Sequence, residues 1–442
     1  MKYVIIIPDG AADLPVPELA GQTPLEAARM PHAARLATMG QLGTVRTTPP
    51  GFAAGSDICC MTLLGYSADR YHTGRAPLEA GALGLMPGLQ DWIFRLNLVT
   101  TSDVGPAAPS DESGLMIYHS AGAITDAEAG ALVRALAAHW ARVEPQLAAQ
   151  FSLHPGVSYR NILIDRSLRD YRGGLGGKDR LQTFPPHEIP RKPWRKFLPR
   201  GSHSDLLIRL MESSRACLAP HEVNVARREA GLREATMAWI WGQGTRPNMP
   251  SYASRFGVRG CITTAVDLLA GIAAFTGLER IAVPGLTSYH DNDYAAQGRA
   301  SIAALDRYDL VIVHVEAPDE ASHQGDFQTK VAALEAIDAH IVGPLLEELE
   351  RRYTPRPGAP NVGWRMLIAP DHYTLCSTLK HDATPPPFVI AGSGIRALGR
   401  GPFCESAAAG ADLHVEPGEA LMEHFYFGGR RKAEPAGAGA GA

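Results

Sequence analysis

The sequence lacks several features that would each point to a particular class of protein. Its six cysteines include no Cys-x-x-Cys spacing, which is typical of reduced thiols in a cytoplasm. No apolar run approaches the ~18 residues of a membrane span. The apolar run at the amino terminus meets Pro8 and Asp9 too early for a signal peptide. The net charge is −4, without the basic excess expected of a protein that binds nucleic acid or a membrane surface. We therefore expect a soluble cytoplasmic protein with neither kind of partner.

The length of the chain favours two domains. At 442 residues it exceeds what one ordinary core usually organises. Strand and helix patterns alternate at both ends, which predicts a mainly parallel sheet with helices on both faces. This α/β domain would be formed by residues 1–90 and 251–432, with residues 91–250 as an inserted α/β domain. The Gly-Ala tail, residues 433–442, is predicted to be disordered.

Buried strands of the main sheet are expected where short apolar runs meet turn residues. Helical periodicity predicts a helix over residues 25–39 and a long helix over 327–352, which Pro344 should kink or divide. The expected strands cover residues 3–7, 281–285, the run from 309, 362–369 and 388–392.

One of these strands is followed at once by polar side chains. The apolar run from Asp309 stops at Pro318, Asp319 comes next, and His323 follows four residues later. A proline ends strand pairing, so Asp319 should lie beyond the carboxyl end of the strand, where open α/β sheets bind ligands. In a helical turn Asp319 and His323 would share one face and could bind one cation. The alternative is that Asp319 caps a helix and His323 is solvated.

The same arrangement recurs at two other strand ends. Asp9 follows the first strand, Asp371 and His372 follow the strand at 362–369, and His381 lies nine residues further on. Carboxylates and imidazoles without cysteine suit Mn²⁺, Mg²⁺ or Zn²⁺. Six such groups exceed what one ion usually takes from side chains. Two neighbouring ions fit better, as in phosphoryl-transfer enzymes whose two metal ions stabilise the attacking and the leaving oxygen.

A nucleophile for such chemistry is offered by Ser56. It follows a loop rich in glycine, proline and alanine and enters a predicted helix, where backbone N–H groups could hold a phosphate. Metal coordination would activate its hydroxyl. The alternative is that Ser56 is the N-cap of the helix, a common role for serine.

Several short stretches, in order along the chain, follow the pattern of a known family. They are Ile-Pro-Asp-Gly at 7–10, Gly-Ser-Asp at 55–57, Leu-Leu-Gly-Tyr at 63–66, Gly-Arg-Ala-Pro-Leu-Glu-Ala at 74–80, Phe-Arg-Leu-Asn-Leu-Val-Thr at 94–100, Trp-Gly-Gln-Gly at 241–244, Val-Asp-Leu-Leu-Ala-Gly-Ile at 266–272, His-Val-Glu-Ala-Pro-Asp-Glu-Ala-Ser-His at 314–323 and Asp-His-Tyr-Thr at 371–374. By these stretches, residues 1–99 and 236–390 resemble the archaeal-type branch of cofactor-independent phosphoglycerate mutase, in the alkaline phosphatase superfamily. Residues 101–235 match only loosely.

The resemblance implies an alkaline-phosphatase-like fold, two divalent metal ions and a small phosphorylated substrate. Mn²⁺ is the expected ion, with Mg²⁺, Zn²⁺ and Co²⁺ as alternatives. The implied reaction moves a phosphoryl group from 3-phosphoglycerate to the serine and returns it to the 2-hydroxyl. One ion would be held by Asp319, His323 and His381, and the other by Asp9, Ser56, Asp371 and His372.

The resemblance also implies four residues that hold the substrate while the phosphoryl group is on the serine. They are Arg75, Arg95, Asn97 and Gln243. For each of them the alternative is a structural salt bridge or a buried amide.

Departures from the family pattern leave the metal ligands intact and put the substrate in doubt. The family usually has a proline where Tyr373 stands and a glutamate where Gln324 stands, and the approach to His381 reads Leu-Lys-His. The basic stretch 191–200 is interpreted as a solvated loop, with a substrate-facing lid as the alternative. Rival functions are a metal-dependent phosphatase, a phosphotransferase acting on another small phosphorylated metabolite, or a non-catalytic metal-binding regulator. The oligomeric state is left open.

Overall fold

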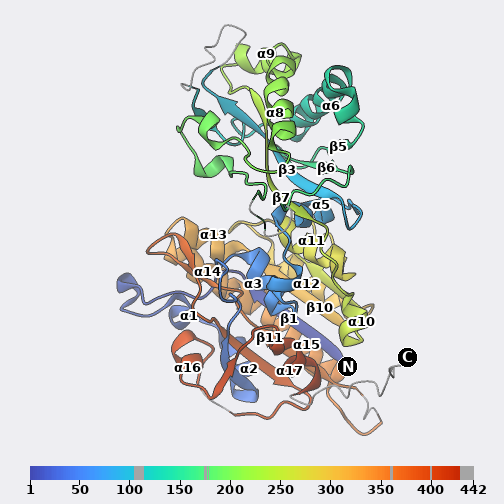
Figure 1. The fold of residues 1–442 in the computed structure, drawn as a ribbon. Helices are drawn as coiled ribbons and strands as arrows, with labels where there is room; N and C mark the ends of the chain where they lie inside the picture. The colour runs from blue at the N-terminus through green and yellow to red at the C-terminus, as the bar shows by residue number, and fades with distance from the viewer. Residues whose placement is uncertain (104–113, 174–176, 178, 359–361, 399–400, 429–442) are drawn as a thin grey trace, which may run out of the picture. The chain divides into compact units, whose positions relative to one another are not determined.

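A computed structural model describes residues 1–103, 114–173, 177, 179–358, 362–398 and 401–428. The chain divides into two compact units (Figure 1). The parallel-sheet unit comprises Met1–His72 and Met249–Ala442, and the inserted unit comprises Thr73–Asn248. The predicted disordered tail at 433–442 lies outside the described residues.

The inserted unit begins earlier in the chain than the sequence pattern suggested. Residues 73–90, which contain α5 (Arg75–Ala82), belong to it. The physical reason is a small apolar cluster, in which Ala76 and Ala80 of α5 pack with Ile93 and Ile162 of the inserted sheet. Because α5 buries its apolar side there, it is part of that core.

The parallel-sheet unit is built on eight strands in the order β15-β2-β14-β11-β1-β10-β8-β9. The central neighbours β11, β1, β10 and β8 run parallel, whereas β14 is antiparallel to both β11 and β2. The bounds are β1 (Lys2–Pro8), β2 (Gln41–Val45), β8 (Gly260–Thr263), β9 (Glu279–Arg280), β10 (Leu310–Val315), β11 (Trp364–Ile368), β14 (Pro387–Gly392) and β15 (Leu413–Val415).

Both faces of this sheet are covered by helices, because successive side chains of a strand point to opposite faces. On β1, Val4 and Ile6 lie in an apolar cluster with side chains of α2 (Pro31–Met39), α14 (Phe327–Ile337) and α15 (Gly343–Tyr353). Tyr3 faces the other way and makes edge contacts with Phe425 and Tyr426 of α17 (Ala420–Phe427). The predicted mainly parallel α/β sheet is confirmed. The unit's other helices are η1 (Pro17–Leu19), α1 (Pro24–Ala27), α3 (Ser56–Leu63), α4 (Ala68–Tyr71), α10 (Tyr252–Phe256), α11 (Asp267–Thr276), α12 (Tyr294–Ala304), α13 (Ala317–His323) and α16 (Glu405–Ala409).

Prolines divide both predicted helices, and only the first prediction needs correction. The helix expected over residues 25–39 is divided into α1 and α2, and Pro31 begins the second. The long helix over 327–352 is divided as expected near Pro344, with a π-helical turn, η4 (Asp338–Val342), between α14 and α15. Proline cannot donate the hydrogen bond that a continuous helix needs at that position.

The strand predicted at residues 281–285 is wrong. These residues form no strand and are partly or fully exposed, and the edge of the sheet is formed by the two-residue β9. The apolar composition resembled a buried strand, but Pro284 and Gly285 form a turn there. The strands predicted at 3–7, from 309, at 362–369 and at 388–392 are confirmed.

The inserted unit has an antiparallel sheet in which β3 lies between β6 and β7. Helices α6 and α8 contribute to its apolar core, and Figure 1 shows them near the sheet strands. The bounds are β3 (Trp92–Thr101), β4 (Met116–Tyr118), β5 (Phe151–His154), β6 (Arg160–Asp165), β7 (Met237–Thr245), α6 (Asp126–Val143), α7 (Pro145–Ala148), α8 (Ser204–Leu218), α9 (Glu222–Glu229), η2 (Pro186–Glu188) and η3 (Trp194–Phe197). Among the described residues, no helix combines the length and apolar character that crossing a bilayer requires.

Candidate metal centre

The first candidate ligand group, which consists of Asp319, His323 and His381, lies at the carboxyl end of β10. Helix α13 places Asp319 and His323 one turn apart on one face, and the Asp319 Oδ2 to His323 Nε2 distance is 3.2 Å. His381, on β13 (Lys380–Asp382), brings its Nε2 to 3.4 Å from Asp319 Oδ1 and to 2.9 Å from His323 Nε2. The alternative that Asp319 caps the helix does not hold, because Glu316 occupies the N-cap position.

The second candidate ligand group, which consists of Asp9, Asp371 and His372, lies at the ends of β1 and β11. His372 Nε2 is 3.5 Å from Asp9 Oδ1 and 3.2 Å from Asp371 Oδ2. All three side chains are fully buried. The turn after β1 is held by the N–H of Gly10, which donates to Asp371 Oδ1 at 3.1 Å. The predicted gathering of Asp9, Asp371 and His372 at one edge of the sheet is therefore present in the structure.

The two groups are neighbours. The rings of His372 and His381 stack with centroids 4.1 Å apart. Thr374, on β12 (Tyr373–Leu375), donates from its Oγ1 to Asp319 Oδ1 at 2.5 Å, and the same oxygen lies 3.1 Å from His372 Nδ1. Thr374 thus contacts one residue of each group through a single hydroxyl.

Ser56 lies beside the second group. It is the first residue of α3, and its Oγ is 3.4 Å from His372 Nε2. Gly55 occupies the N-cap position, so the alternative that Ser56 is an N-cap is wrong. The positive end of the α3 dipole lies at this hydroxyl, which favours an incoming anion. Next to Ser56, Asp57 Oδ2 is 2.9 Å from His72 Nε2.

Four side chains in the surroundings of Asp9 and Asp371 were not predicted from the sequence. His314 Nε2 lies 2.7 Å from Asp9 Oδ2, while Thr264 Oγ1 lies 3.0 Å from its Nδ1. Glu316 Oε2 is 3.6 Å from His314 Nε2, and Cys60 Sγ donates to Asp371 Oδ2 at 3.4 Å. His314 and Glu316 belong to the matched stretch 314–323, but their positions within the strand and at its end gave no sign that they face Asp9.

The electrostatics of the centre suit bound cations. Burial, followed by the charges of Asp371 and Asp319, raises the pKa of Asp9 well above its usual value. Among the described residues, no hydrogen-bond partner is found for the buried atoms Asp9 Oδ1 and Glu316 Oε2, which is costly unless a cation or proton compensates. Carboxylate oxygens and imidazole nitrogens are suitable donors for divalent ions, so these residues fit a metal centre.

The first group shows the same demand for positive charge. Burial acts to raise the pKa of Asp319, but the hydrogen bonds from His323 and His381 outweigh it and the pKa lies well below its usual value. In return, the hydrogen bond with Asp319 raises the pKa of His323 to about 9. Two imidazole nitrogens and a carboxylate oxygen therefore face one point, where a shared cation would satisfy all three.

In the inserted unit, three of the four predicted substrate residues, Arg95, Asn97 and Gln243, make contacts within the unit. Arg95 forms an ion pair with Glu79 at 2.8 Å, and its guanidinium lies over the Trp241 ring at 4.1 Å. Asn97 Oδ1 accepts from Trp241 Nε1 at 3.1 Å. Gln243 donates to a backbone carbonyl and accepts from a threonine hydroxyl at 2.5 Å. These contacts are the ones expected if the residues have structural roles, as an ion pair or as buried amides. Binding of substrate by the same groups stays a prediction.

Positive charge gathers around Arg95. Arg75, at the start of α5, and Arg160, at the start of β6, both lower the pKa of Arg95 electrostatically, after burial. The His187 ring lies 6.1 Å from the His119 ring, and burial lowers the pKa of His187, with Arg95 and Arg75 adding to the effect. We call Arg75, Arg95 and Arg160 the cationic cluster; burial also lowers the pKa of His119, so the two imidazoles beside the cluster favour their neutral form. Arg160 and the two histidines had no signal in the sequence, because only the pairing of distant strands brings them together.

The basic stretch 191–200 is partly anchored. Trp194 is fully buried, and its Nε1 donates to Asp103 Oδ1 at 3.0 Å. Arg195 donates to Asp103 Oδ2 at 3.1 Å. The interpretation as a solvated loop is therefore wrong for this part, while a substrate-facing lid stays a prediction.

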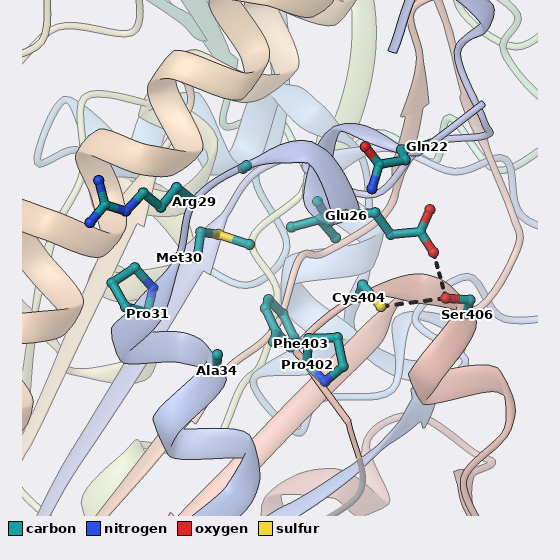
Figure 2. Close-up of a pocket in the computed structure, with 12 residues that line it drawn as sticks. Gln22, Glu26, Arg29, Met30, Pro31, Ala34, Pro402, Phe403, Cys404 and Ser406 are labelled. Carbon is teal, nitrogen blue, oxygen red and sulfur yellow. Dashed lines mark hydrogen bonds between the residues drawn. The ribbon is translucent and has the colours of Figure 1, made fainter. Parts of the chain in front are cut away.

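A separate pocket of about 540 Å³ is formed by residues that do not include any member of the two ligand groups (Figure 2). It lies between α1, the start of α2 and the segment before α16. Its polar side chains bond one another, since Ser406 Oγ donates to Glu26 Oε1 at 2.5 Å and lies 3.5 Å from Cys404 Sγ. The pocket is therefore no part of the candidate centre.

Comparison with known proteins supplies the family. A family model described as 2,3-bisphosphoglycerate-independent phosphoglycerate mutase matches residues 37–224. A protein of that name from Methanothrix thermoacetophila is 40% identical over 395 residues, which cover 89% of this chain and 92% of the relative. The chain belongs to this family. A probable 2,3-bisphosphoglycerate-independent phosphoglycerate mutase from Geobacter sulfurreducens is 37% identical over 424 residues, which cover 96% of this chain and 99% of the relative.

Two solved structures share the fold of this phosphoglycerate mutase family member. A protein from Pyrococcus horikoshii matches with a TM-score of 0.76 at 24% identity, covering 96% of each chain. A cofactor-independent phosphoglycerate mutase from Thermoplasma acidophilum matches with a TM-score of 0.64 at 21% identity, covering 96% of this chain and 99% of the other. The resemblance, the alkaline-phosphatase-like fold with its inserted domain, and the enzyme class, an isomerase, are confirmed.

The structure shows the surroundings of one residue that departs from the family pattern. Tyr373, where the family usually has proline, forms isolated bridges with Ala11 and Ala12 in the loop after β1. Its ring is buried in the apolar cluster beneath the sheet. The substitution therefore lies in the supporting structure of the centre and leaves the side chains of Asp371 and His372 in place.

Proposed function

We propose that this chain interconverts 3-phosphoglycerate and 2-phosphoglycerate without 2,3-bisphosphoglycerate, through a phosphoserine at Ser56. The observation that carries the proposal is the gathering of Ser56 with two adjacent Asp/His groups in one unit of a phosphoglycerate mutase family member. The reaction is a step of glycolysis, and we place it in the cytoplasm.

Two divalent ions belong to this proposal, with Mn²⁺ as the preferred ion. Asp319, His323 and His381 would hold one, and Asp9, Ser56, Asp371 and His372 the other. When bound, such ions neutralise phosphoryl oxygens and make a serine hydroxyl a better nucleophile at neutral pH. The carboxylates must be ionised and the imidazoles neutral for binding, so acidification weakens the site.

The residues of the chain perform two phosphoryl transfers, first to Ser56 and then away from it. In the first, Ser56 Oγ forms a bond to phosphorus while the bond to the 3-oxygen of the substrate breaks, and the hydroxyl proton of Ser56 passes to that oxygen. In the second, the 2-oxygen of glycerate forms a bond to the same phosphorus while the bond to Ser56 Oγ breaks, and the proton of the 2-hydroxyl passes to Ser56 Oγ. The net reaction is an isomerisation that needs no co-substrate.

Glycerate must stay bound between the two transfers, and water must not reach the phosphoserine. The cationic cluster of the inserted unit, with Asn97 and Gln243 beside it, is the candidate for this task. Arginine suits a carboxylate because its guanidinium can donate two parallel hydrogen bonds. The proposal assigns Arg75, Arg95, Asn97 and Gln243 to the glycerate carboxylate and hydroxyls.

The test measures both products formed from 3-phosphoglycerate in the absence of 2,3-bisphosphoglycerate. Metal-depleted protein should be inactive, and added Mn²⁺ should restore formation of 2-phosphoglycerate with little free phosphate. If the main product is free phosphate, the chain is a phosphatase. If neither product forms with any of Mn²⁺, Mg²⁺, Zn²⁺ or Co²⁺, the proposed activity is wrong.

Replacement of the nucleophile provides a second test. Ser56→Ala should fold and bind metal but lose turnover by several orders of magnitude, since one group both attacks and leaves. Mass spectrometry of the quenched wild-type reaction should find phosphate on Ser56. The matched control is Ser301→Ala, which removes another buried hydroxyl, one that donates to the Gln297 carbonyl at 2.8 Å. Near-normal turnover of Ser56→Ala would refute the role of Ser56.

A further inference from the structure

A fully buried lysine lies behind the candidate centre and is not used by the proposed reaction. Lys330, in α14, has no exposed surface, and its ammonium has three acceptors. Its Nζ donates to Asp13 Oδ2 at 2.9 Å, to the Thr374 carbonyl at 2.8 Å and to the Ala12 carbonyl at 3.4 Å. An ammonium has three protons, so this set uses its whole hydrogen-bonding capacity.

The acceptors belong to the two segments that carry the second ligand group. Ala12 and Asp13 follow Asp9 in the loop after β1, while Thr374 follows Asp371 and His372. Asp13 Oδ2 also accepts the N–H of Cys376 at 3.2 Å, and the Thr374 N–H donates to the Ala12 carbonyl at 3.1 Å. The Lys330–Asp13 pair therefore joins the two segments from behind.

Lys330 is also connected to the first ligand group, through Thr374. The Thr374 carbonyl accepts from Lys330, and its hydroxyl donates to Asp319 Oδ1. Lys330 itself lies in the helix that follows α13, which carries Asp319 and His323. One ammonium is thus bonded to a residue that contacts both groups.

We propose that Lys330 is a positioning residue that fixes the separation of the two metal groups. It acts through the Ala12 and Thr374 carbonyls and touches no candidate ligand itself. The inference rests on the two-ion site of the proposed function. A buried ion pair alone is weak evidence of a role beyond stability, because neutral replacements are often equally stable. Specifically, the hydrogen bonds from Lys330 to the two carbonyls matter for metal binding. Their effect can be separated by experiment from the effect of the lysine charge.

Two variants make that separation. Lys330→Met removes the ammonium at similar volume and leaves the Asp13 carboxylate buried and unpaired, which is strongly destabilising. Lys330→Met combined with Asp13→Asn removes the unpaired charge, and the amide oxygen can still accept the Cys376 N–H. The double variant should therefore regain stability. Both variants lack the donor to the Ala12 and Thr374 carbonyls.

A matched control is offered by Arg365, another buried cation of the same unit. It donates to the Ser393 carbonyl at 2.7 Å and the Phe425 carbonyl at 2.6 Å. Neither acceptor belongs to a ligand-bearing segment. Arg365→Met should lower stability without changing metal binding.

The readouts are urea unfolding of the metal-depleted proteins, calorimetric titration with Mn²⁺, and the electron paramagnetic resonance spectrum of the Mn²⁺-loaded proteins. The wild type should bind two ions and give the spectrum of a magnetically coupled pair. Lys330→Met and the double variant should both bind at least one Mn²⁺ about 10–100-fold more weakly, with an altered coupled spectrum, although their stabilities differ.

The outcomes separate the inference from the function it rests on. If the double variant regains both stability and wild-type Mn²⁺ binding, Lys330 is only structural and the inference is wrong. The same holds if Lys330→Met binds Mn²⁺ with an unchanged affinity and spectrum. If the wild type itself takes up a single ion, the proposed two-ion site is wrong and the inference falls with it.

Discussion

Replacing Gly10 by alanine should damage the metal centre more than it damages the fold. Gly10 has a φ of +58°, in the left-handed region, where an alanine costs about 1–2 kcal/mol. A Cβ at this position would lie 2.5 Å from both Asp319 Oδ1 and Thr374 Oγ1. Those atoms would have to move by about 1 Å to reach ordinary contact. The total cost in the free energy of unfolding is about 2–5 kcal/mol.

The displacement acts directly on a candidate ligand. Metal–ligand distances tolerate changes of about 0.2 Å, so a shift of Asp319 several times larger should weaken Mn²⁺ binding by about 10–100-fold. This corresponds to about 1.4–2.7 kcal/mol of binding free energy. Calorimetric titration of metal-depleted protein measures it, and urea unfolding gives the stability of the same samples.

Gly21→Ala is the matched control, because Gly21 has a φ of +78° and no neighbouring atom within 4 Å of the added Cβ. It should cost only the backbone penalty and leave Mn²⁺ binding unchanged. The difference between the two variants isolates the contact with Asp319. Gly10→Ala with wild-type Mn²⁺ affinity would refute the assignment of Asp319 as a ligand held in this geometry.

Further predictions concern pH, substrate retention and the metals. Burial raises the pKa of Glu405 to about 7, above its value of 4.5 in the unfolded chain, so this group's stabilising contribution is complete below pH 4.5 and is lost as the pH rises to 7. This change corresponds to about 3 kcal/mol of the free energy of unfolding, and Glu405→Gln should remove it. If the wild type, like Glu405→Gln, has the same urea midpoint at pH 5 as at pH 8, the prediction is wrong. Arg95→Ala should raise the ratio of free phosphate to 2-phosphoglycerate formed from 3-phosphoglycerate, whereas Arg169→Ala, which removes a different arginine of the inserted unit from its ion pair with Asp165, should not. Chelation should lower the melting temperature, since the clustered carboxylates lose their counter-charge, and an unchanged melting curve would argue against a bound ion.

The sequence by itself determined where the candidate metal ligands stand along the chain. Parallel strands end at the same edge of a sheet, so an aspartate placed within a few residues of the end of each of three buried strands predicts one site. This local rule was sufficient for Asp9, Asp319 and Asp371, and the i, i+4 spacing in α13 was sufficient for His323. The central strands were predictable for the same reason, because burial on both faces leaves a continuous apolar run.

Only the tertiary structure decided which other side chains surround those ligands. His314 faces Asp9 because β10 pairs in parallel with β1, with Ile7 opposite His314. Lys330 looks in the sequence like a charged residue on a helix, yet it is fully buried and donates to one carbonyl in the loop after β1 and to one on β12. In the cationic cluster, Arg95 and Arg160 likewise come together only through the pairing of β3 with β6. Such contacts join residues tens to hundreds of positions apart, and no local pattern encodes the partner of a side chain whose environment is formed only when the sheet assembles.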